Sequence, residues 1–330
     1  MKHSRITLQD IANLTGLNKM TVSRYLRNPD QVSQRSRELI SKAMEDKNYI
    51  PNRAPAILFN ARSKTIGVVI PSFRNQIFSD VLAGIESVTS AHQYQTLIAN
   101  YEYDINREER EVLNLLSYNI DGLILTSSKH SMRMIEYVRA SGIPVAELMD
   151  IGGKPIDIQV GFDNEKAARD MASAFIESGK RSLVFMGSMD DSRDLSRYHG
   201  TESAFANHGL KVRHMSPHAL SSVPLGRKMF LEMQRNHPDT DAVFCTNDDL
   251  AVGVLLECMA RGIEVPKRIA IAGFHGLEIG RASPKKIASV VTPRFKIGKT
   301  ATEIMLAHLS GEKAIETVNM GYQIYYGDTL

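Results

Sequence analysis

Residues 7–26 read TLQDIANLTGLNKMTVSRYL, and this stretch predicts two short helices joined by a tight turn. Thr7 can cap the first helix, and Asp10, three residues later, favours its N-terminus. Gly16 falls in the turn, where a left-handed backbone costs glycine little. Asn18 can cap the second helix. The side chains that face inward in this arrangement are Leu8, Ile11, Ala12, Leu17, Val22 and Leu26.

Several side chains that remain on the outside gather near the start of the second helix. In a helix-turn-helix this end of the second helix enters the major groove, so we expect the unit to bind a specific DNA sequence. Lys19, Met20 and Arg24 are the candidates for contacts with base edges, where the apolar Met20 suits a thymine methyl group. The candidates for contacts that position the DNA backbone are Gln9, Thr21 and Ser23, and Thr7 is a further expected DNA contact. The alternative is a structural helical hairpin with a charged rim.

The charge of the chain is unevenly divided. The 330 residues carry a formal net charge of +3, but residues 1–62 hold 11 Lys and Arg against 5 Asp and Glu, an excess of +6. The remaining residues therefore carry −3. A basic head on a mildly acidic body is typical of a phosphate-binding module attached to a core with a separate task.

A third helix and a linker follow the motif. Ser33 is a candidate cap, and the apolar stripe Leu39, Ile40, Ala43 and Met44 has helical spacing, which predicts a core-facing surface. Pro51 then ends the preceding segment, and a short helix is expected from about Asn52, with Pro55 tolerated in its first turn. Such a short helix is marginal alone and needs a partner to become ordered.

From Thr65 onward, short apolar runs alternate with amphipathic stretches, which predicts parallel sheets covered by helices on both faces. The predicted strands are 66–70, 95–99, 122–125, 144–148, 158–162, 183–186, 242–244, 269–272 and 288–291. The predicted helices are 81–92, 107–118, 165–178, 224–236, 250–260 and 295–309. So many strands indicate two sheets rather than one.

Small polar or charged residues follow most of these strands. Ligands of open parallel sheets bind beyond the carboxyl ends of the strands, and such residues suit a polyhydroxylated ligand. They are Ser72, Thr126, Asp150, Asp163, Gly187, Ser188, Asn247, Asp248, His275 and Thr292. For each one the alternative is an ordinary loop residue or a helix cap, and Asp163 and Asn247 in particular directly precede helices.

Over essentially its whole length the chain resembles the LacI family of transcriptional regulators. The motifs that carry the resemblance are LQDIA at 8–12, TVSRYL at 21–26, YIPNR at 49–53, DGLIL at 121–125, FCTNDD at 244–249 and IAGF at 271–274. The resemblance implies an all-α DNA-binding domain at 1–48 and a hinge at 49–63. It also implies a two-lobed, doubly wound α/β core like that of periplasmic sugar-binding proteins. The core subdomains are then 64–162 with 292–320, and 163–291 with 321–330.

The same resemblance implies a homodimer on palindromic operator DNA and an effector in the cleft between the lobes. It places Asn52 and Leu58 on the DNA, with Leu58 as a wedge between central base pairs, for which an apolar side chain is suited. The resemblance is carried further by Gly273-Phe274-His275-Gly276, where most members of the family have aspartate in place of His275. This variant resembles the branch that responds to gluconate and L-idonate.

A sugar acid needs a cation in the cleft, and Arg197, His275 and Arg294 are candidates. Arg197 is the strongest of them, because a guanidinium can hold a carboxylate by two bonds and the family places a ligand arginine there. The full set of expected ligand residues is Ser72, Phe73, Phe78, Thr126, Glu147, Asp150, Arg197, Asn247, His275 and Arg294.

Other chemistries find little support. His214 and His218 are four residues apart, but the sequence shows nothing to complete a metal site. Cys245 and Cys258 lack metal-type spacing and fit a reducing cytoplasm. The sequence has no nucleophile elbow, phosphate-binding P-loop or His-Glu-x-x-His motif, so we expect neither enzymatic activity nor a cofactor.

Two functions from different classes therefore compete. The favoured one is an effector-controlled, cytoplasmic DNA-binding regulator, whose effector is a sugar acid or, alternatively, a neutral sugar. The other is a sugar-binding or sugar-modifying protein whose basic head is incidental. We expect no signal peptide, because the first residues are polar, and no membrane partner, because no apolar run is long enough to span a bilayer.

Overall fold

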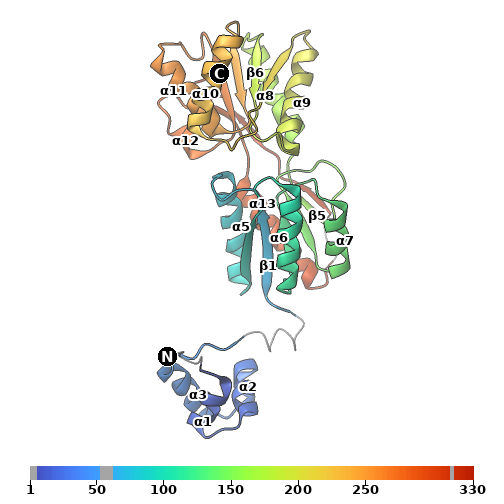
Figure 1. Ribbon diagram of the computed structural model, residues 1–330, viewed down its shortest axis with the longest axis vertical. Coiled ribbons are helices and arrows are strands. Elements are labelled where there is room, and N and C mark those ends of the chain that lie inside the picture. The colour runs from blue at the N-terminus through green and yellow to red at the C-terminus, as the bar shows by residue number, and fades with distance from the viewer. Residues whose placement is uncertain (1–5, 53–61, 313–315) are drawn as a thin grey trace. The chain divides into compact units, whose positions relative to one another are not determined.

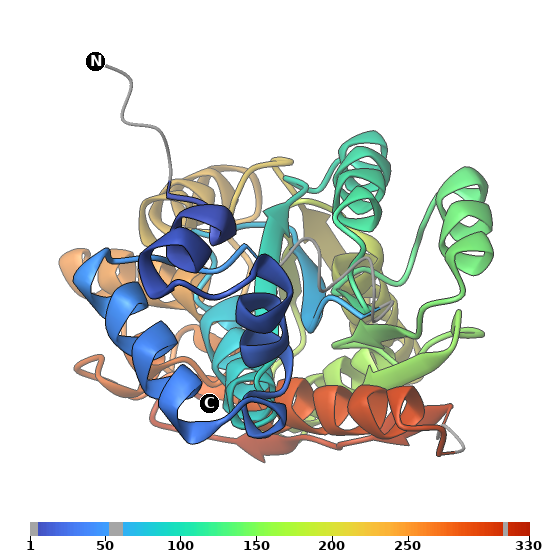
Figure 2. The same cartoon turned by 90° about the horizontal axis from the view of Figure 1, so that it is seen from below.

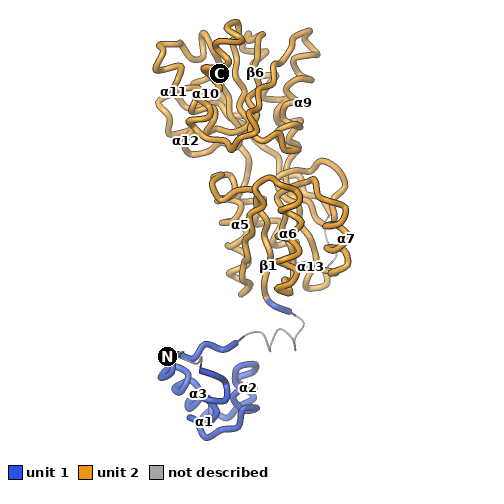
Figure 3. The backbone as a smooth tube through the Cα atoms, viewed as in Figure 1, with its two compact units in different colours: residues 1–63 blue, residues 64–330 orange. Residues whose placement is uncertain are grey.

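The computed structural model of the chain describes residues 6–52, 62–312 and 316–330. It divides into two units, residues 1–63 and residues 64–330, each with its own internal contacts (Figure 3). The first is all-helical within its described part, and the second is α/β.

The first unit confirms the predicted helix-turn-helix. Its elements are α1 (Leu8–Thr15), α2 (Lys19–Arg27), the 3₁₀ turn η1 (Pro29–Gln31) and α3 (Gln34–Asp46). Thr7 and Asp10 form a reciprocal capping box on α1, and the side chain of Asn18 accepts a 2.7 Å bond from the Thr21 amide to cap α2. Gly16 ends α1 with φ = +67°, the left-handed conformation that its turn requires.

A small core holds these three helices together. Ile11 and Ala12 of α1, Val22 of α2 and Ile40 of α3 are buried against one another. The expectation for Leu39 was wrong, since its side chain remains 44% exposed. With only three short helices, one narrow stripe of α3 suffices to close the core, and Leu39 lies outside that stripe.

The second unit contains two six-stranded sheets. The first has the order β11-β5-β4-β3-β1-β2 and the second the order β12-β10-β9-β8-β6-β7. The strands of the first sheet are β1 (Thr65–Ile70), β2 (Gln95–Asn100), β3 (Gly122–Leu125), β4 (Val145–Leu148), β5 (Ile158–Gly161) and β11 (Thr317–Asn319). Those of the second are β6 (Leu183–Met186), β7 (Val212–Met215), β8 (Ala242–Cys245), β9 (Ala270–His275), β10 (Ala288–Val291) and β12 (Gln323–Tyr325).

We call the first sheet with its helices the N-lobe and the second the C-lobe (Figure 1). The strands pair in parallel except for β12, which runs antiparallel to β10. In each lobe the first strand lies between the second and the third, so the direction of winding changes beside β1 and beside β6. Ligands of such sheets bind at this change, beyond the carboxyl ends of the strands.

Helices cover both faces of each sheet. In the N-lobe they are α5 (Ile77–Ala91), α6 (Ile105–Ser117), α7 (Met132–Ser141) and α13 (Arg294–Leu309). In the C-lobe they are α8 (Asn164–Glu177), α9 (Ser192–Ala206), α10 (Val223–Asn236), α11 (Asp248–Ala260) and α12 (Glu278–Arg281). No helix among the described residues has the length and apolar character that crossing a bilayer requires.

Successive side chains of a strand pack against the helices on opposite faces of the sheet. In β1, Val68 packs with α5 and α13, whereas Val69 packs with α6 and α7. These two pairs of helices cover opposite faces of the sheet (Figures 1 and 2). In β6, Phe185 packs with α8 and α9, and Val184 packs with α10 and α11. This two-sided burial explains why the strands read as continuous apolar runs rather than as alternating patterns.

The chain passes between the lobes three times: after β5, after β10 and after β11. Aromatic rings pack at these passages. Phe162 lies 6.1 Å from Phe274 and 6.4 Å from Tyr322, measured between ring centroids, and it belongs to one buried cluster that includes side chains of both lobes.

Several elements lie outside the sequence-based prediction, among them β7, β11, β12, α7 and α9. β7 is an edge strand whose four side chains are all half-buried, so it lacks the apolar run used to recognise its neighbours. The start of α9 is rich in polar residues because these line the cleft described below. The predicted helix from about Asn52 lies, apart from its first residue, outside the described residues.

Helices α5 and α13 approach closely at two glycines. A Cβ atom on Gly84 would clash with the backbone carbonyl of Phe295, and one on Gly298 would clash with that of Val81. Only glycine permits this crossing without moving the backbone of one helix.

We therefore expect Gly84→Ala to lower the free energy of unfolding of the core by about 1–3 kcal/mol, since overpacking outweighs the better helix propensity of alanine. Urea denaturation followed by circular dichroism measures this. Ser90→Ala, at an exposed position of the same helix, is the matched control. Equal midpoints for Gly84→Ala and the wild type would contradict the close crossing.

Candidate functional site

The outer surface of the helix-turn-helix presents the side chains proposed for reading bases. Met20 is 71% exposed, and Lys19 and Arg24 are also exposed, although each sits on an ordered helix. Thr21 and Ser23 are half-buried. An exposed large apolar side chain near two cations suits a groove that carries both methyl groups and charge.

Other proposed DNA contacts already have intramolecular partners. Thr7 donates its hydroxyl to Asp10, Thr21 donates its hydroxyl to Asn18, and Gln9 donates its amide to Asn13. These bonds hold the side chains in place at the helix starts. Leu58 lies outside the described residues.

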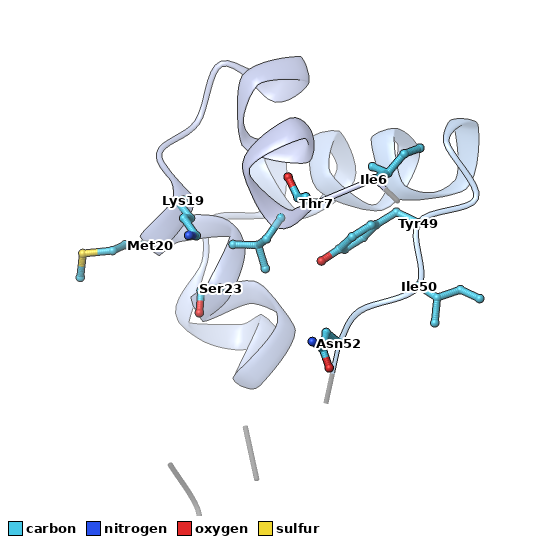
Figure 4. A pocket seen from close by; sticks show the side chains of 9 residues that line it. Ile6, Thr7, Lys19, Met20, Ser23, Tyr49, Ile50 and Asn52 are labelled. Carbon is cyan, nitrogen blue, oxygen red and sulfur yellow. The ribbon is translucent and has the colours of Figure 1, made fainter. Parts of the chain in front are cut away.

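A hollow of about 540 Å³ adjoins the start of α2 (Figure 4). Several proposed DNA contacts line it together with apolar side chains, and its lining comprises Ile6, Thr7, Leu8, Lys19, Met20, Ser23, Tyr49, Ile50 and Asn52. The structure thus brings Asn52, which is remote in sequence, to the same surface as the start of the second helix.

The second unit has a cleft between its lobes with two adjoining chambers. The inner chamber is small, about 20 Å³, and is lined by Asn75, Ile77, Phe78, Tyr103, Ser188, Asp191, Arg193, Asp194, Arg197, Asn247 and His275. The outer chamber, of about 330 Å³, is lined by Ser72, Arg74, Asn75, Gln76, Tyr103, Leu220, Ser221, Ser222, Asp249, Leu277 and Ile279. Both lie beyond the carboxyl ends of strands, where open sheets bind ligands.

Arg197 is the most constrained cation of the inner chamber. Its Nε donates to Asn164 at 2.9 Å and its Nη1 donates to the carbonyl oxygen of Thr246 at 2.9 Å. The guanidinium lies 3.9 Å above the ring of Phe274. Burial lowers the pKa of Arg197 to about 10, so it remains a cation at neutral pH. The bonds described above use Nε and Nη1, and Nη2 is the nitrogen that they do not use.

Asn247 sits at the N-cap position of α11, yet its side chain makes no capping bond. It is only 6% exposed, and its Oδ1 atom has no partner among the described residues. An unsatisfied buried acceptor is costly unless a ligand or water completes it. Asp163, by contrast, caps α8 by accepting from the Lys166 amide, so the alternative of a simple cap holds for Asp163 and not for Asn247.

His275 is fully enclosed, and its Nδ1 lies 3.0 Å from the hydroxyl of Thr292. Burial lowers the pKa of His275 well below its ordinary value, and the charges of Arg197, Arg294 and Arg193 lower it further. The imidazole is therefore neutral. Its backbone has φ = +91°, a conformation that non-glycine residues rarely adopt and that often marks functional sites.

Arg193 and Asp191, which the sequence analysis missed, also line the inner chamber. Asp191 caps α9 through the amides of Arg193 and Asp194, and its other oxygen accepts from Arg193 Nη2 at 2.9 Å. Their signal in the sequence was the polar run DDSRD at 190–194, which lies just past a predicted strand.

Five of the expected ligand residues line the chambers, namely Ser72, Phe78, Arg197, Asn247 and His275. Four other expected ligand residues, which line neither chamber, lie near the chambers or on the surface. Thr126 donates to the carbonyl oxygen of Val69, and Asp150 accepts from Asn164. Arg294 bonds Asp80 of α5 and the carbonyl oxygen of His275, whereas Phe73 is exposed.

The remaining expected ligand residue, Glu147, lies in a buried cluster in the N-lobe. Its Oε1 is 3.3 Å from His130 Nε2, and Glu108 Oε2 is 2.9 Å from His130 Nδ1. Burial alone would lower the pKa of His130, but the hydrogen bond to Glu108 and the close carboxylate of Glu147 outweigh it and raise the pKa to about 9. Glu147 therefore ties β4 to His130 and lines neither chamber.

No group of three metal-ligating side chains has a metal-binding arrangement among the residues that the structure describes. His214 and His218 both face Asp190, at 3.3 and 3.6 Å. Both cysteines are buried, and burial raises their pKa values, which leaves them as unreactive thiols.

Comparison with known proteins covers both units. The family model described as bacterial regulatory proteins, lacI family, matches residues 7–52. The model described as periplasmic binding proteins and sugar binding domain of LacI family matches residues 63–324. The chain is similar over its full length, and theirs, to two Escherichia coli K12 proteins, the HTH-type transcriptional regulators IdnR (52% identity) and GntR (45%).

A crystal structure of a LacI-family transcriptional regulator from Silicibacter pomeroyi superposes on the chain with a TM-score of 0.93. It shares 34% sequence identity and covers 98% of this chain and 99% of its own.

The His130 cluster generates a pH prediction. Because the folded state raises the pKa of His130 from 6.5 to about 9, its stabilisation is complete below pH 6.5 and is lost as pH rises to about 9. The loss amounts to about 3 kcal/mol at most. Thermal unfolding of the wild type and of His130→Gln, compared at pH 6 and pH 9.5, measures it. A stability difference between the two proteins that is the same at both pH values would refute a charged His130.

Proposed function

The chain belongs to the LacI family of bacterial transcriptional regulators, and we propose that it is a dimeric, cytoplasmic regulator whose operator binding is controlled by a small sugar acid. DNA binding by the helix-turn-helix follows from the family. The sugar acid, the dimer and the roles of individual residues form the proposal. We assign no reaction to the cleft.

Asn247 Oδ1, which has no partner among the described residues, lines the same chamber as Arg197, whose Nη2 is left over from the bonds described above, and this arrangement carries the proposal of an effector site. One is an acceptor and the other a cationic donor, and both are buried. Such a pair is suited to a ligand with hydroxyl groups and an acidic end. His275, which is neutral and lines the same chamber as Arg193 and Arg197, adds a further polar group.

A neutral sugar is the second candidate, and the outer chamber favours it. Its lining carries hydroxyl and amide groups from both lobes, including Ser72, Asn75, Gln76 and Ser221. These groups bond hydroxyls equally well in an acid and in a neutral sugar. The cations of the two chambers, Arg193 and Arg197 in the inner one and the exposed Arg74 in the outer one, are therefore the feature that distinguishes the two candidates.

On the DNA, we propose that Lys19, Met20 and Arg24 read base edges in the major groove, with Thr7, Gln9, Thr21, Ser23 and Asn52 positioning the backbone. Two copies on a palindrome would place two helix starts in successive major grooves. Leu58 of each copy would act as the minor-groove wedge. The effector would act by changing the angle between the lobes, so effector and operator must alter each other's affinity by the same factor.

Arg24→Ala tests the base-reading role. We expect it to weaken specific operator binding by about 1–3 kcal/mol and to relax the preference at one base pair, because a base-edge contact is lost. Gel-shift titrations against the operator and a set of single-base variants measure both effects. Arg37→Ala, on α3 and paired with Asp30, is the control. Equal weakening on every sequence would assign Arg24 to the phosphates instead.

Arg197→Ala tests the effector site. We expect it to abolish the response of operator binding to gluconate and L-idonate, a coupling of about 1–3 kcal/mol, while operator binding itself persists. Fluorescence anisotropy with and without each acid measures this, and thermal unfolding checks that the variant folds. The control is Arg261→Ala, which removes an exposed arginine paired with Glu257. A normal response in Arg197→Ala would make Arg197 structural and leave Arg193 as the arginine of the inner chamber available to the carboxylate.

A further inference from the structure

The two chambers of the cleft adjoin, because Asn75 and Tyr103 line both. The inner chamber, at about 20 Å³, is much the smaller of the two. The outer chamber, at about 330 Å³, is within the range of small-molecule sites. A hydroxylated chain therefore fits the outer chamber, and only a compact end group can enter the inner one.

Two guanidinium groups face that inner chamber, and they differ in the donors they have left. Arg197 has its Nε and Nη1 engaged by Asn164 and Thr246. It retains Nη2 alone, which can serve a hydroxyl as readily as a carboxylate oxygen. The side chain of Arg193 makes a single hydrogen bond among the described residues, to Asp191. A guanidinium has five N–H donors, so Arg193 has the larger reserve.

The surroundings of Arg193 keep it charged and in place. Its guanidinium lies 5.9 Å over the Phe78 ring of the N-lobe, although Arg193 itself belongs to the C-lobe. Burial disfavours its charge, but Asp191 and the nearby Tyr101 and Tyr103 raise its pKa above the ordinary value. The side chain is thus a buried cation that reaches across the cleft.

The two carboxylates of the inner chamber are occupied. Asp194 accepts from the amides of Ser188, Met189 and Asp190 through one oxygen and from the Thr246 hydroxyl through the other. One oxygen of Asp191 caps α9, and only the other one bonds the Arg193 side chain. Among the described residues that line this chamber, Asp191 is therefore the carboxylate that competes directly with a ligand for Arg193.

We propose that Arg193 selects acids over neutral polyols: the carboxylate of a bound sugar acid lies on the Arg193 guanidinium in the inner chamber, and its hydroxylated chain lies in the outer chamber. This inference rests on the proposed function and names the residue that sets its ligand class. Bidentate binding of a carboxylate needs two neighbouring donors. Arg193 offers them, whereas Arg197 is largely committed and Arg294 is already bonded to Asp80 and His275.

The test uses gluconate and glucitol, which share a six-carbon hydroxylated chain and differ by the carboxylate. Isothermal titration calorimetry on the full-length protein gives both affinities. We expect the wild type to prefer gluconate by about a hundredfold or more, and Arg193→Gln to lose most of that preference by weakening gluconate alone. Arg193→Lys keeps the charge without the planar pair of donors, so we expect its preference for gluconate to lie between those of the wild type and of Arg193→Gln.

Asp191→Asn is an independent variant that we expect to change the affinity for gluconate in the opposite direction. Asparagine caps a helix about as well as aspartate, so α9 keeps its cap while the competing negative charge is removed. We expect gluconate to bind several-fold more tightly and glucitol to be unchanged. Arg213→Gln is the matched control, because Arg213 is a C-lobe arginine paired at 3.0 Å with Asp239 outside both chambers.

Each outcome is decisive. Retention of the wild-type preference for gluconate in Arg193→Gln overturns the role of Arg193 while the proposed sugar-acid effector stands. Absence of any gluconate binding by the wild type overturns the sugar-acid proposal itself, and Arg193 with it. If Arg193→Gln does not fold, as judged by thermal unfolding, unchanged preferences in Arg193→Lys and Asp191→Asn overturn the inference.

Discussion

The buried bond between Arg197 and Asn164 is the interaction on which the geometry of the cleft depends. Asn164 is fully buried, accepts from Arg197 through its oxygen, and donates through its nitrogen to the Met149 carbonyl and to Asp150. One amide side chain thus joins Arg197, an arginine of the C-lobe that lines the inner chamber, to the end of β4 in the N-lobe. In a low-dielectric interior such a network must be fully satisfied, so its members hold one arrangement.

Around this bond, the lobes are linked at points that a change of angle would alter. Ser128 of the N-lobe lies 3.1 Å from Ser192 at the start of α9, and Arg294 bonds both Asp80 and the carbonyl oxygen of His275. These contacts lie beside the chambers rather than far from them. A ligand that enters the cleft consequently meets groups whose partners belong to both lobes, which is the physical requirement for converting binding into domain movement.

The fold followed closely from the sequence where the pattern was strong. Strands β3, β6 and β10 have the bounds that their apolar runs predicted, since a strand buried on both faces must be apolar throughout. The helix-turn-helix could be predicted because a helix cap or a turn glycine determines the backbone only of the few residues next to it, and these residues are adjacent in the sequence. Edge strand β7 and helix α9 were not, because their polarity reflects an edge position and a cleft that no local pattern describes.

The candidate site, like the fold, was predicted from the sequence only in part. The sequence by itself determined the class of both units and placed Asn247 and His275 at strand ends, because β-strand ends are marked by local changes from apolar to polar residues. Arg197, which lies within helix α9, was expected from the family resemblance. Only the tertiary structure decided which of these residues line a common chamber. It placed Glu147 against His130 and Arg294 against Asp80, and it brought Arg193 into the chamber from a polar run with no distinctive spacing. The reason is that partners 17 to 214 residues apart meet through sheet order and lobe packing, which periodicity along the chain does not encode.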